Sequence, residues 1–328
     1  MSIGKARLRL LLEKFKGSKI LVIGDLILDQ FIWGDVSRIS PEAPVPVVHV
    51  QRESFMPGGA ANVACSIKDL QGNAAITGTI GSDLWGRKLK KLLKKKSDIK
   101  GVIVDGVRDT TLKTRIVARH QQVVRVDREM ISPLSKKISD EIISYVNKNA
   151  KSFKAIIIED YGKGVISPYL IQAVLRIAKK RKLIVTVDPK EEHFSYYKGA
   201  TCITPNQFEA EKAAGMKIVD LKSLDASGEK LLKELNLKAV LITRGEAGMA
   251  LYVQDKKPVY IPTRAQEVFD VSGAGDTVIG AFTLALASGA SFNEAAHISN
   301  YAAGVVVGKV GIGSCSQKEL IEKINVDS

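Results

Sequence analysis

The sequence predicts an α/β fold of three layers, α/β/α, in which a mainly parallel β-sheet lies between two layers of helices. Two patterns indicate this fold. Short runs rich in aliphatic and β-branched residues alternate with segments of helical periodicity along most of the 328 residues. The runs contain few polar residues, as is typical of strands covered on both faces. Ligands of such folds bind beyond the carboxyl ends of the strands, so functional residues are expected there.

Strands and helices are predicted in turn along the chain. The predicted strands cover residues 19–24, 73–80, 155–158, 183–187, 201–204 and 239–243. The predicted helices cover residues 59–70, 84–95, 135–149, 168–180, 207–214 and 223–235. Capping signals mark three helix starts: Ser167 before Pro168, and the capping boxes Ser291-x-x-Glu294 and Ser316-x-x-Glu319.

Two segments break the alternation and predict a second, smaller sheet. Residues 45–51 are strand-like, and residues 112–128 contain two alternating strands that turn near residues 119–120 without a helix between them. The sequence contains no repeat, low-complexity linker or shift of composition. We therefore expect one domain over residues 1–328, with the strands of a small β-sheet lid inserted near residues 31–55 and 108–130.

Composition excludes several classes of protein. Hydrophobic residues make up 45% of the chain and charged residues 26%, which is ordinary for a globular protein. The N-terminal residues are too rich in cations for a signal peptide, and no run of about 18 apolar residues predicts a membrane span. Cys65, Cys202 and Cys315 lie far apart and form no zinc or disulfide pattern. A cytoplasmic location is expected.

A basic segment accounts for much of the net charge of +14. Residues 87–96 contain seven cations, but Leu89, Leu92 and Leu93 recur at helical spacing between them. This pattern favours a helix with a solvated charged face over a nucleic-acid or membrane patch, because no nucleic-acid motif accompanies it. No specific nucleic-acid partner is expected.

The most informative stretch is residues 270–277, Asp-Val-Ser-Gly-Ala-Gly-Asp-Thr, which precedes a helical pattern. Small residues allow a ligand to approach the backbone, and the free N–H groups of the helix start favour phosphate oxygens. Asp276 stands in the first turn of this helix. It either complements the helix dipole or acts as a general base beside an anion hole, which is the arrangement for phosphoryl transfer to a hydroxyl.

A second glycine-rich stretch, residues 57–64 (Pro-Gly-Gly-Ala-Ala-Asn-Val-Ala), precedes another predicted helix. Together the two stretches resemble the two signatures of the ribokinase-like (PfkB) family of sugar kinases. Further matches follow in the family's order: Gly24-Asp25, Gly81-x-Asp83-x-x-Gly86, Asn206-x-x-Glu209, Thr243-Arg244-Gly245-x-x-Gly248 and Lys309-x-Gly311. The resemblance covers nearly the whole chain and implies the ribokinase-like fold with its small β lid.

The resemblance implies roles for the residues on the nucleotide side. Asp276 matches the catalytic base, and the amides of Gly273, Ala274 and Gly275 match the anion hole. ATP and Mg²⁺ are the implied cofactors. The positions that match nucleotide binding are Asn206, Glu209, Thr243, Gly245, Gly248 and Asn300, with Glu209 holding the metal through water. A K⁺ site is implied by the family, although no side chain here identifies it.

The implied sugar site is formed by residues that match the family's hydroxyl-binding positions: Asp25, Gly58, Gly59 and Asn62. Three further polar residues stand at predicted strand ends and are expected to reach a ligand: Asp160, Lys163 and Lys190.

Within the family, the sequence is most similar to the bacterial D-glycero-β-D-manno-heptose 7-phosphate kinases of lipopolysaccharide-core synthesis. Residues 37–47, 113–115, 119–127, 160–164 and 188–190 carry this similarity. It implies ATP-dependent phosphorylation at O1 to give heptose 1,7-bisphosphate. The alternatives are another kinase of the family, for ribose, fructose or a hexose phosphate, and a non-catalytic protein that binds sugar or nucleic acid. Because no His-x-Gly-His motif is present, the adenylyltransferase of the pathway is expected on a separate protein.

Cations in the predicted hairpin are candidates for binding the substrate's phosphate. The two-residue period puts Lys113, Arg115 and Arg119 on one face, and Arg125 joins them from the second strand if the turn is tight. The other interpretation is a charged, solvated sheet edge that prevents aggregation. By analogy with the family, the lid is also expected to pair two subunits in a homodimer.

Overall fold

A mainly parallel sheet forms the centre of the molecule. The computed structural model describes the chain except for residues 1–3, 119–120, 266–267, 269, 310–312 and 327–328. The strands are β1 (Lys19–Gly24), β4 (Asn73–Gly81), β5 (Asp98–Asp105), β8 (Ala155–Glu159), β9 (Ile184–Asp188), β10 (Cys202–Ile203), β11 (Ala239–Thr243), β12 (Met249–Val253) and β13 (Val259–Ile261). Over the described residues their order is β13-β12-β11-β10-β9-β8-β1-β4-β5. Pairing is antiparallel only where β12 meets β11 and β13.

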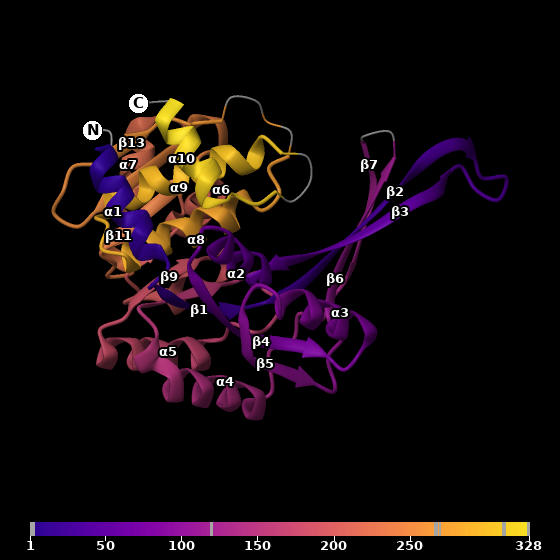
Figure 1. The fold of residues 1–328 in the computed structure, drawn as a ribbon, viewed down its shortest axis with the longest axis horizontal. Helices are drawn as coiled ribbons and strands as arrows, with labels where there is room; N and C mark the ends of the chain where they lie inside the picture. The colour runs from indigo at the N-terminus through magenta and orange to yellow at the C-terminus, as the bar shows by residue number, and fades with distance from the viewer. Residues whose placement is uncertain (1–3, 119–120, 266–267, 269, 310–312, 327–328) are drawn as a thin grey trace.

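Helices cover both faces of this sheet (Figure 1). One layer contains α1 (Lys5–Phe15), α2 (Ala60–Asp69), α8 (Ala274–Ala287), α9 (Phe292–Val307) and α10 (Gln317–Val326). The other layer contains α4 (Lys136–Asn149), α5 (Pro168–Arg181), α6 (Gln207–Ala214) and α7 (Leu221–Glu234). Three short 3₁₀ helices among the described residues are η1 (Ala150–Ser152), η2 (Glu191–Tyr197) and η3 (Gly245–Ala247). Alternate residues of β1 point into two separate cores: Ile20 and Val22 into one, Leu21 and Ile23 into the other. The predicted three-layer fold is confirmed.

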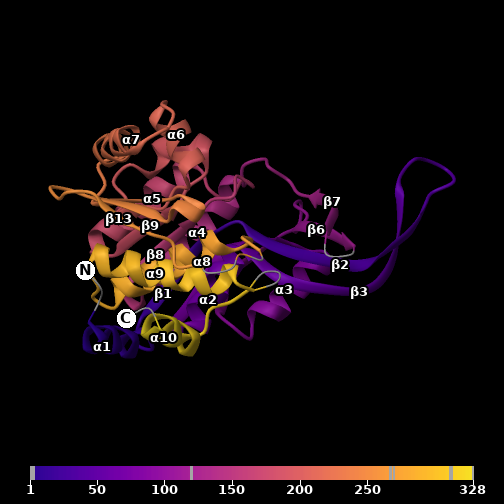
Figure 2. The same ribbon diagram turned by 90° about the horizontal axis from the view of Figure 1, so that it is seen from above.

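The second sheet is also present and extends away from the body of the molecule (Figures 1 and 2). It consists of β2 (Leu26–Ile39), β3 (Pro46–Gly59), β6 (Thr111–Ala118) and β7 (Gln121–Arg128), in the order β3-β2-β6-β7. Sequence analysis expected lid strands near residues 31–55 but identified only residues 45–51 as a strand, so it missed the start of β2, the end of β3 and the bounds of both. The first six residues of β2 are buried and its end is exposed, so no single hydrophobic period runs through it.

Most predicted elements agree with the structure at their centres and differ at their ends. The helix predicted from residue 223 begins at Leu221, because Asp220 caps it by accepting a hydrogen bond from the Ser223 amide. The three predicted caps are confirmed, with Ser167, Ser291 and Ser316 each accepting from a backbone amide of the first turn. Helix α1 and strands β5, β12 and β13 were not predicted.

The basic segment forms α3 (Leu84–Leu93) and the turn after it. Leu89 and Leu93 are buried, whereas Lys91, Lys94 and Lys95 are exposed, so the predicted apolar stripe and charged face are both present. The lysines after α3 line a groove at the amino ends of β1 and β4, which is the edge of the sheet opposite to the site described next. Among the described helices, none combines the length and the apolar character that crossing a membrane requires.

Candidate active site

A cleft of about 410 Å³ opens where the strands β8, β9 and β11 end, beside the start of α8 and the base of the lid. Its walls contain both glycine-rich backbone and charged side chains. The lining residues are Lys113, Asp160, Tyr161, Lys163, Asp188, Pro189, Lys190, Thr204, Asn206, Glu209, Thr243, Gly273, Gly275 and Asp276. The polar residues predicted at strand ends therefore meet in one place, together with the start of α8.

Asp276 is a buried carboxylate in the first turn of α8, with 3% of its surface exposed. Its Oδ2 accepts a hydrogen bond from Asn62 Nδ2 at 2.6 Å, and its Oδ1 accepts one from the Tyr161 hydroxyl at 2.8 Å. Burial raises the pKa of Asp276 to about 6, against the lowering effect of these two hydrogen bonds. A carboxylate with this pKa is ionised at neutral pH and is well matched to take up a proton there.

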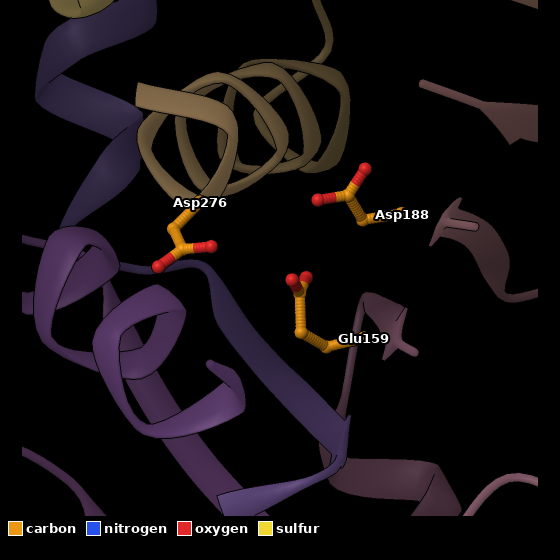
Figure 3. A group of neighbouring side chains, drawn as sticks. All are labelled: Glu159, Asp188 and Asp276. Atoms are coloured by element: carbon orange, nitrogen blue, oxygen red, sulfur yellow. The ribbon is translucent and has the colours of Figure 1, made fainter. Parts of the chain in front are cut away.

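Two further acids face Asp276 (Figure 3). Carboxylate oxygens of Glu159, Asp188 and Asp276 lie within 4.8 Å of one another. Glu159 is fully buried, and neither of its oxygens has a hydrogen-bond partner among the described residues. Burial, followed by neighbouring carboxylates, raises the pKa of Glu159 and of Asp188 well above the usual range. Three acidic side chains that face one another in a buried place fit a hard divalent cation, which prefers oxygen ligands.

Of the predicted sugar-binding residues Asp25, Gly58, Gly59 and Asn62, Asn62 is hydrogen-bonded to Asp276, and none is among the described residues that line the cleft. Asp25 accepts hydrogen bonds from the amides of Tyr161, Lys163 and Val165 at 3.0 to 3.2 Å, and burial raises its pKa to about 6. This carboxylate therefore holds the loop after β8 in place. Gly58 and Gly59 lead into α2, which carries Asn62. A side chain at Gly58 would meet Asp29 Oδ2 at 2.0 Å, so the close approach requires glycine.

Four of the predicted polar side chains reach the cleft. Lys113 comes from the lid, while Asp160, Lys163 and Lys190 come from the loops after β8 and β9. Asp160 is held by the Gly162 amide at 2.8 Å, the Tyr197 hydroxyl at 2.6 Å and His193 Nδ1 at 2.8 Å. Lys190 pairs with Glu191 at 3.1 Å. Three cations therefore line the same cleft as the start of α8.

The predicted arginines are placed differently. Arg115 pairs with Asp29 and lies over the Phe31 ring, 5.3 Å from its centroid. Arg125 pairs with Asp127 at 3.1 Å, and 51% of its side chain is exposed. Neither is among the described residues that line the cleft. Arg119 lies outside the described residues.

A second cavity of about 530 Å³ adjoins the cleft and shares Thr243 and Gly275 with it. The predicted nucleotide residues Thr243, Gly245, Gly248 and Asn300 line it, together with Ala274 and apolar residues such as Met249, Val278 and Val307. Gly248 has φ +79°, and a Cβ there would lie 2.1 Å from the Ile261 carbonyl oxygen, so glycine is required. Asn300 is 4% exposed and donates to the Pro262 carbonyl at 2.8 Å, so it is a buried hydrogen-bond donor.

Asn206 and Glu209 form a reciprocal capping box at the start of α6. The Asn206 side chain accepts from the Glu209 amide at 2.9 Å, and Glu209 Oε2 accepts from the Asn206 amide at 2.8 Å. Both residues line the cleft. Burial raises the pKa of Glu209. The cap orients this carboxylate toward the same cleft as Asp276.

Sequence reasoning gave no role to Tyr161, Glu159 or Asp188. Glu159 and Asp188 are the last residues of β8 and β9, and Tyr161 follows β8 by two residues. The general rule that parallel strands present ligand-binding residues at their carboxyl ends was the available signal. The hydrogen bond from Tyr161 to Asp276 joins residues 115 positions apart and has no local signature.

A buried carboxylate, the amides of a helix start and several cations around one cleft are the parts that phosphoryl transfer to a hydroxyl requires. The sequence profile described as "pfkB family carbohydrate kinase" matches residues 18–319. The chain therefore belongs to the PfkB family of carbohydrate kinases and is a sugar kinase. The family implies ATP and a divalent metal.

Curated relatives agree with this membership, and solved structures share the fold. The chain is 46% identical over 302 residues to the bifunctional protein HldE of Geobacter metallireducens and 45% identical to that of Geobacter sulfurreducens. Each match covers 92% of this chain and 62% of the relative, so this chain spans less than two thirds of the length of these two relatives. Phosphofructokinase-2 from Escherichia coli shares the fold, with a TM-score of 0.79 at 18% identity over 94% of this chain and 99% of that one. Arabidopsis thaliana ribokinase, solved with ribose and ATP, also shares the fold. Its TM-score is 0.75 at 19% identity, and the match covers 94% of this chain and 98% of the ribokinase.

The two hydrogen bonds on Asp276 lead to a prediction about its ionisation. Tyr161→Phe removes one donor to the carboxylate, so the charged form is less stabilised and the pKa of Asp276 should rise above its value of about 6. An NMR titration of ¹³C-labelled aspartate carboxyls measures this pKa, with the signal assigned through Asp276→Asn. An unchanged or lower pKa would show that the tyrosine does not stabilise the carboxylate.

Proposed function

We propose that the chain transfers the γ-phosphoryl group of ATP to O1 of D-glycero-β-D-manno-heptose 7-phosphate and forms heptose 1,7-bisphosphate for ADP-heptose and lipopolysaccharide-core synthesis. The observation that carries the proposal is the position of Lys113, Lys163 and Lys190 in the same cleft as Asp276. A substrate that already has one phosphate needs cations away from the reacting hydroxyl. The motif resemblance to heptose 7-phosphate kinases and the HldE relatives also support it.

In the proposed reaction, Asp276 is the general base. Its carboxylate takes the proton from the O1 hydroxyl, and that oxygen forms a bond to the γ-phosphorus while the bond from this phosphorus to the leaving oxygen of ADP breaks. Asn62 and Tyr161 keep the carboxylate in one orientation. The amides of Gly273, Ala274 and Gly275 donate to the transferring phosphoryl group, and each such donor contributes ~3 kcal/mol.

The second cavity is the proposed site of the nucleotide. Its apolar wall suits an adenine ring, and the shared residues Thr243 and Gly275 lead from there to the cleft, where the phosphates would lie. Glu159, Asp188 and Glu209 are the acids proposed to hold Mg²⁺, with Glu209 acting through water. The metal would neutralise phosphate charge. A K⁺ site follows only from the family resemblance.

The lid is proposed to pair two subunits, while residues 1–328 act as one kinase unit. Strands β3 and β7 are the two edges of the lid sheet. Val123, Val124 and Val126 of β7 are all exposed, as are Val50 and Ile39 on β3 and β2. An edge strand with an exposed apolar side is a site for pairing with a second chain.

Substrate class is tested by ADP release from ATP-Mg²⁺ with a panel of sugars. The highest kcat/KM is expected with the heptose 7-phosphate, above the free heptose, ribose, fructose and fructose 6-phosphate. Lys113→Gln should raise KM for the heptose 7-phosphate by about 10- to 100-fold, because a charge-assisted contact is lost, and should change KM for the free heptose little. Lys256→Gln, in the exposed turn between β12 and β13, is the matched control. A wild-type preference for a free sugar would overturn the assignment in favour of another sugar kinase.

Dimerisation is tested by sedimentation equilibrium. The wild-type chain should sediment as a dimer at micromolar concentration, and the double change Val124→Lys with Val126→Lys should yield monomers by placing charge on the apolar edge of β7. A monomeric wild-type chain, or a dimer that survives these changes, would contradict pairing through the lid.

A further inference from the structure

Two of the three cations in the cleft already lie beside acids. Lys163 Nζ donates to Glu129 Oε1 at 2.7 Å. Lys113 Nζ donates to Asp127 Oδ2 at 3.2 Å and lies 3.7 Å from Glu129 Oε2. Glu129 thus lies between the lid, which contributes Lys113, and the loop after β8, which contributes Lys163. Its Oε2 is buried and has no hydrogen-bond partner among the described residues, so this carboxylate is incompletely compensated.

The backbone holds Glu129 in this position. Arg108 is buried, and its Nη1 donates to the carbonyls of Met130 and Lys163, both at 2.7 Å. One guanidinium nitrogen therefore ties the residue after Glu129 to the residue that pairs with Glu129. Arg108 Nη2 also donates to the Ser132 carbonyl at 2.5 Å. Because the backbone is anchored at these points, the Glu129 side chain begins beside the two ammonium groups, while the side chain itself is free of these bonds.

We propose that Glu129 is an internal competitor for the anion-binding position formed by Lys113 and Lys163, and thereby determines how strongly the cleft binds a phosphate group. The inference rests on the proposed function, in which the substrate brings a phosphate to these lysines. A phosphate dianion carries more charge than one carboxylate and offers more acceptor oxygens. It can therefore displace Glu129, whereas a neutral hydroxyl group cannot.

Such competition makes the site bind phosphorylated sugars in preference to uncharged ones. A free sugar gains nothing from the lysines while Lys163 is paired with Glu129, and Lys113 with Asp127 and Glu129. A phosphorylated sugar replaces the Glu129 contacts with stronger ones. The displaced carboxylate would move toward solvent, while the phosphate would bridge the lid through Lys113 and the body through Lys163. Removing the negative charge at residue 129 should therefore tighten phosphate binding, whereas loss of an ordinary contact residue would weaken it.

The test uses inorganic phosphate and the full chain, with binding measured by calorimetry. Glu129→Gln should lower the dissociation constant of phosphate by about three- to tenfold, as expected when one like charge beside a partly screened anion site is removed. Glu322→Gln makes the same change of net charge at the Lys318 ion pair of α10, and should leave phosphate affinity unaltered. Adding Lys163→Gln to Glu129→Gln should abolish the gain, which ties it to this lysine.

Steady-state kinetics provides the second measurement. Glu129→Gln should lower KM for the heptose 7-phosphate with kcat nearly unchanged. Unchanged or weaker phosphate affinity in folded Glu129→Gln would overturn the inference. Should that variant fail to fold, Glu129→Asp replaces it: the shorter side chain withdraws the carboxylate from Lys163, so phosphate should again bind more tightly, and unchanged affinity would overturn the inference. If wild type shows no preference for phosphorylated sugars, the proposed function fails instead, independently of the calorimetry.

Discussion

The burial of the Asp276 carboxylate is the constraint on which the rest of the site depends. An ionised group taken out of water is costly unless hydrogen bonds compensate it, and here the donors come from two other parts of the chain. Asn62 is supplied by α2 and Tyr161 by the loop after β8, so both must pack against the first turn of α8. The same burial that requires these donors also raises the pKa toward neutrality. Packing and acid–base chemistry therefore have a common cause.

A second buried carboxylate extends this arrangement toward the lid. Asp25 follows β1, and its carboxylate accepts hydrogen bonds from three backbone amides of the loop that carries Tyr161 and Lys163. This loop is tied in turn to the segment after β7 by Arg108. The positions of Asp276 and of Lys163 thus depend on one loop, which is held from the sheet on one side and from the segment after β7 on the other.

The sequence predicted the three-layer fold, most of its helices and the small second sheet, because these depend on local periodicity, caps and turn residues. Asp276 and the glycine-rich start of α8, which the sequence predicted from a continuous motif, lie at the cleft, and Thr243, Gly245 and Gly248 of another motif line the adjoining cavity. The long strand β2 was expected only as part of a lid insertion near residues 31–55, without bounds, because its buried half and its exposed half carry no common period. The pairs Tyr161–Asp276 and Lys163–Glu129 were missed for another reason: each joins distant segments, and only the tertiary fold brings them together.

The central claim is that Asp276 accepts the proton of the attacking hydroxyl. Single-turnover kinetics of Asp276→Asn, with ATP binding measured in parallel, tests it most directly, because the amide keeps the shape of the side chain and removes the proton acceptor. The rate of phosphoryl transfer should fall by ~10²–10⁴, while the dissociation constant of ATP changes little. A rate within a few-fold of the wild type would contradict the account, since a different group would then have to take the proton.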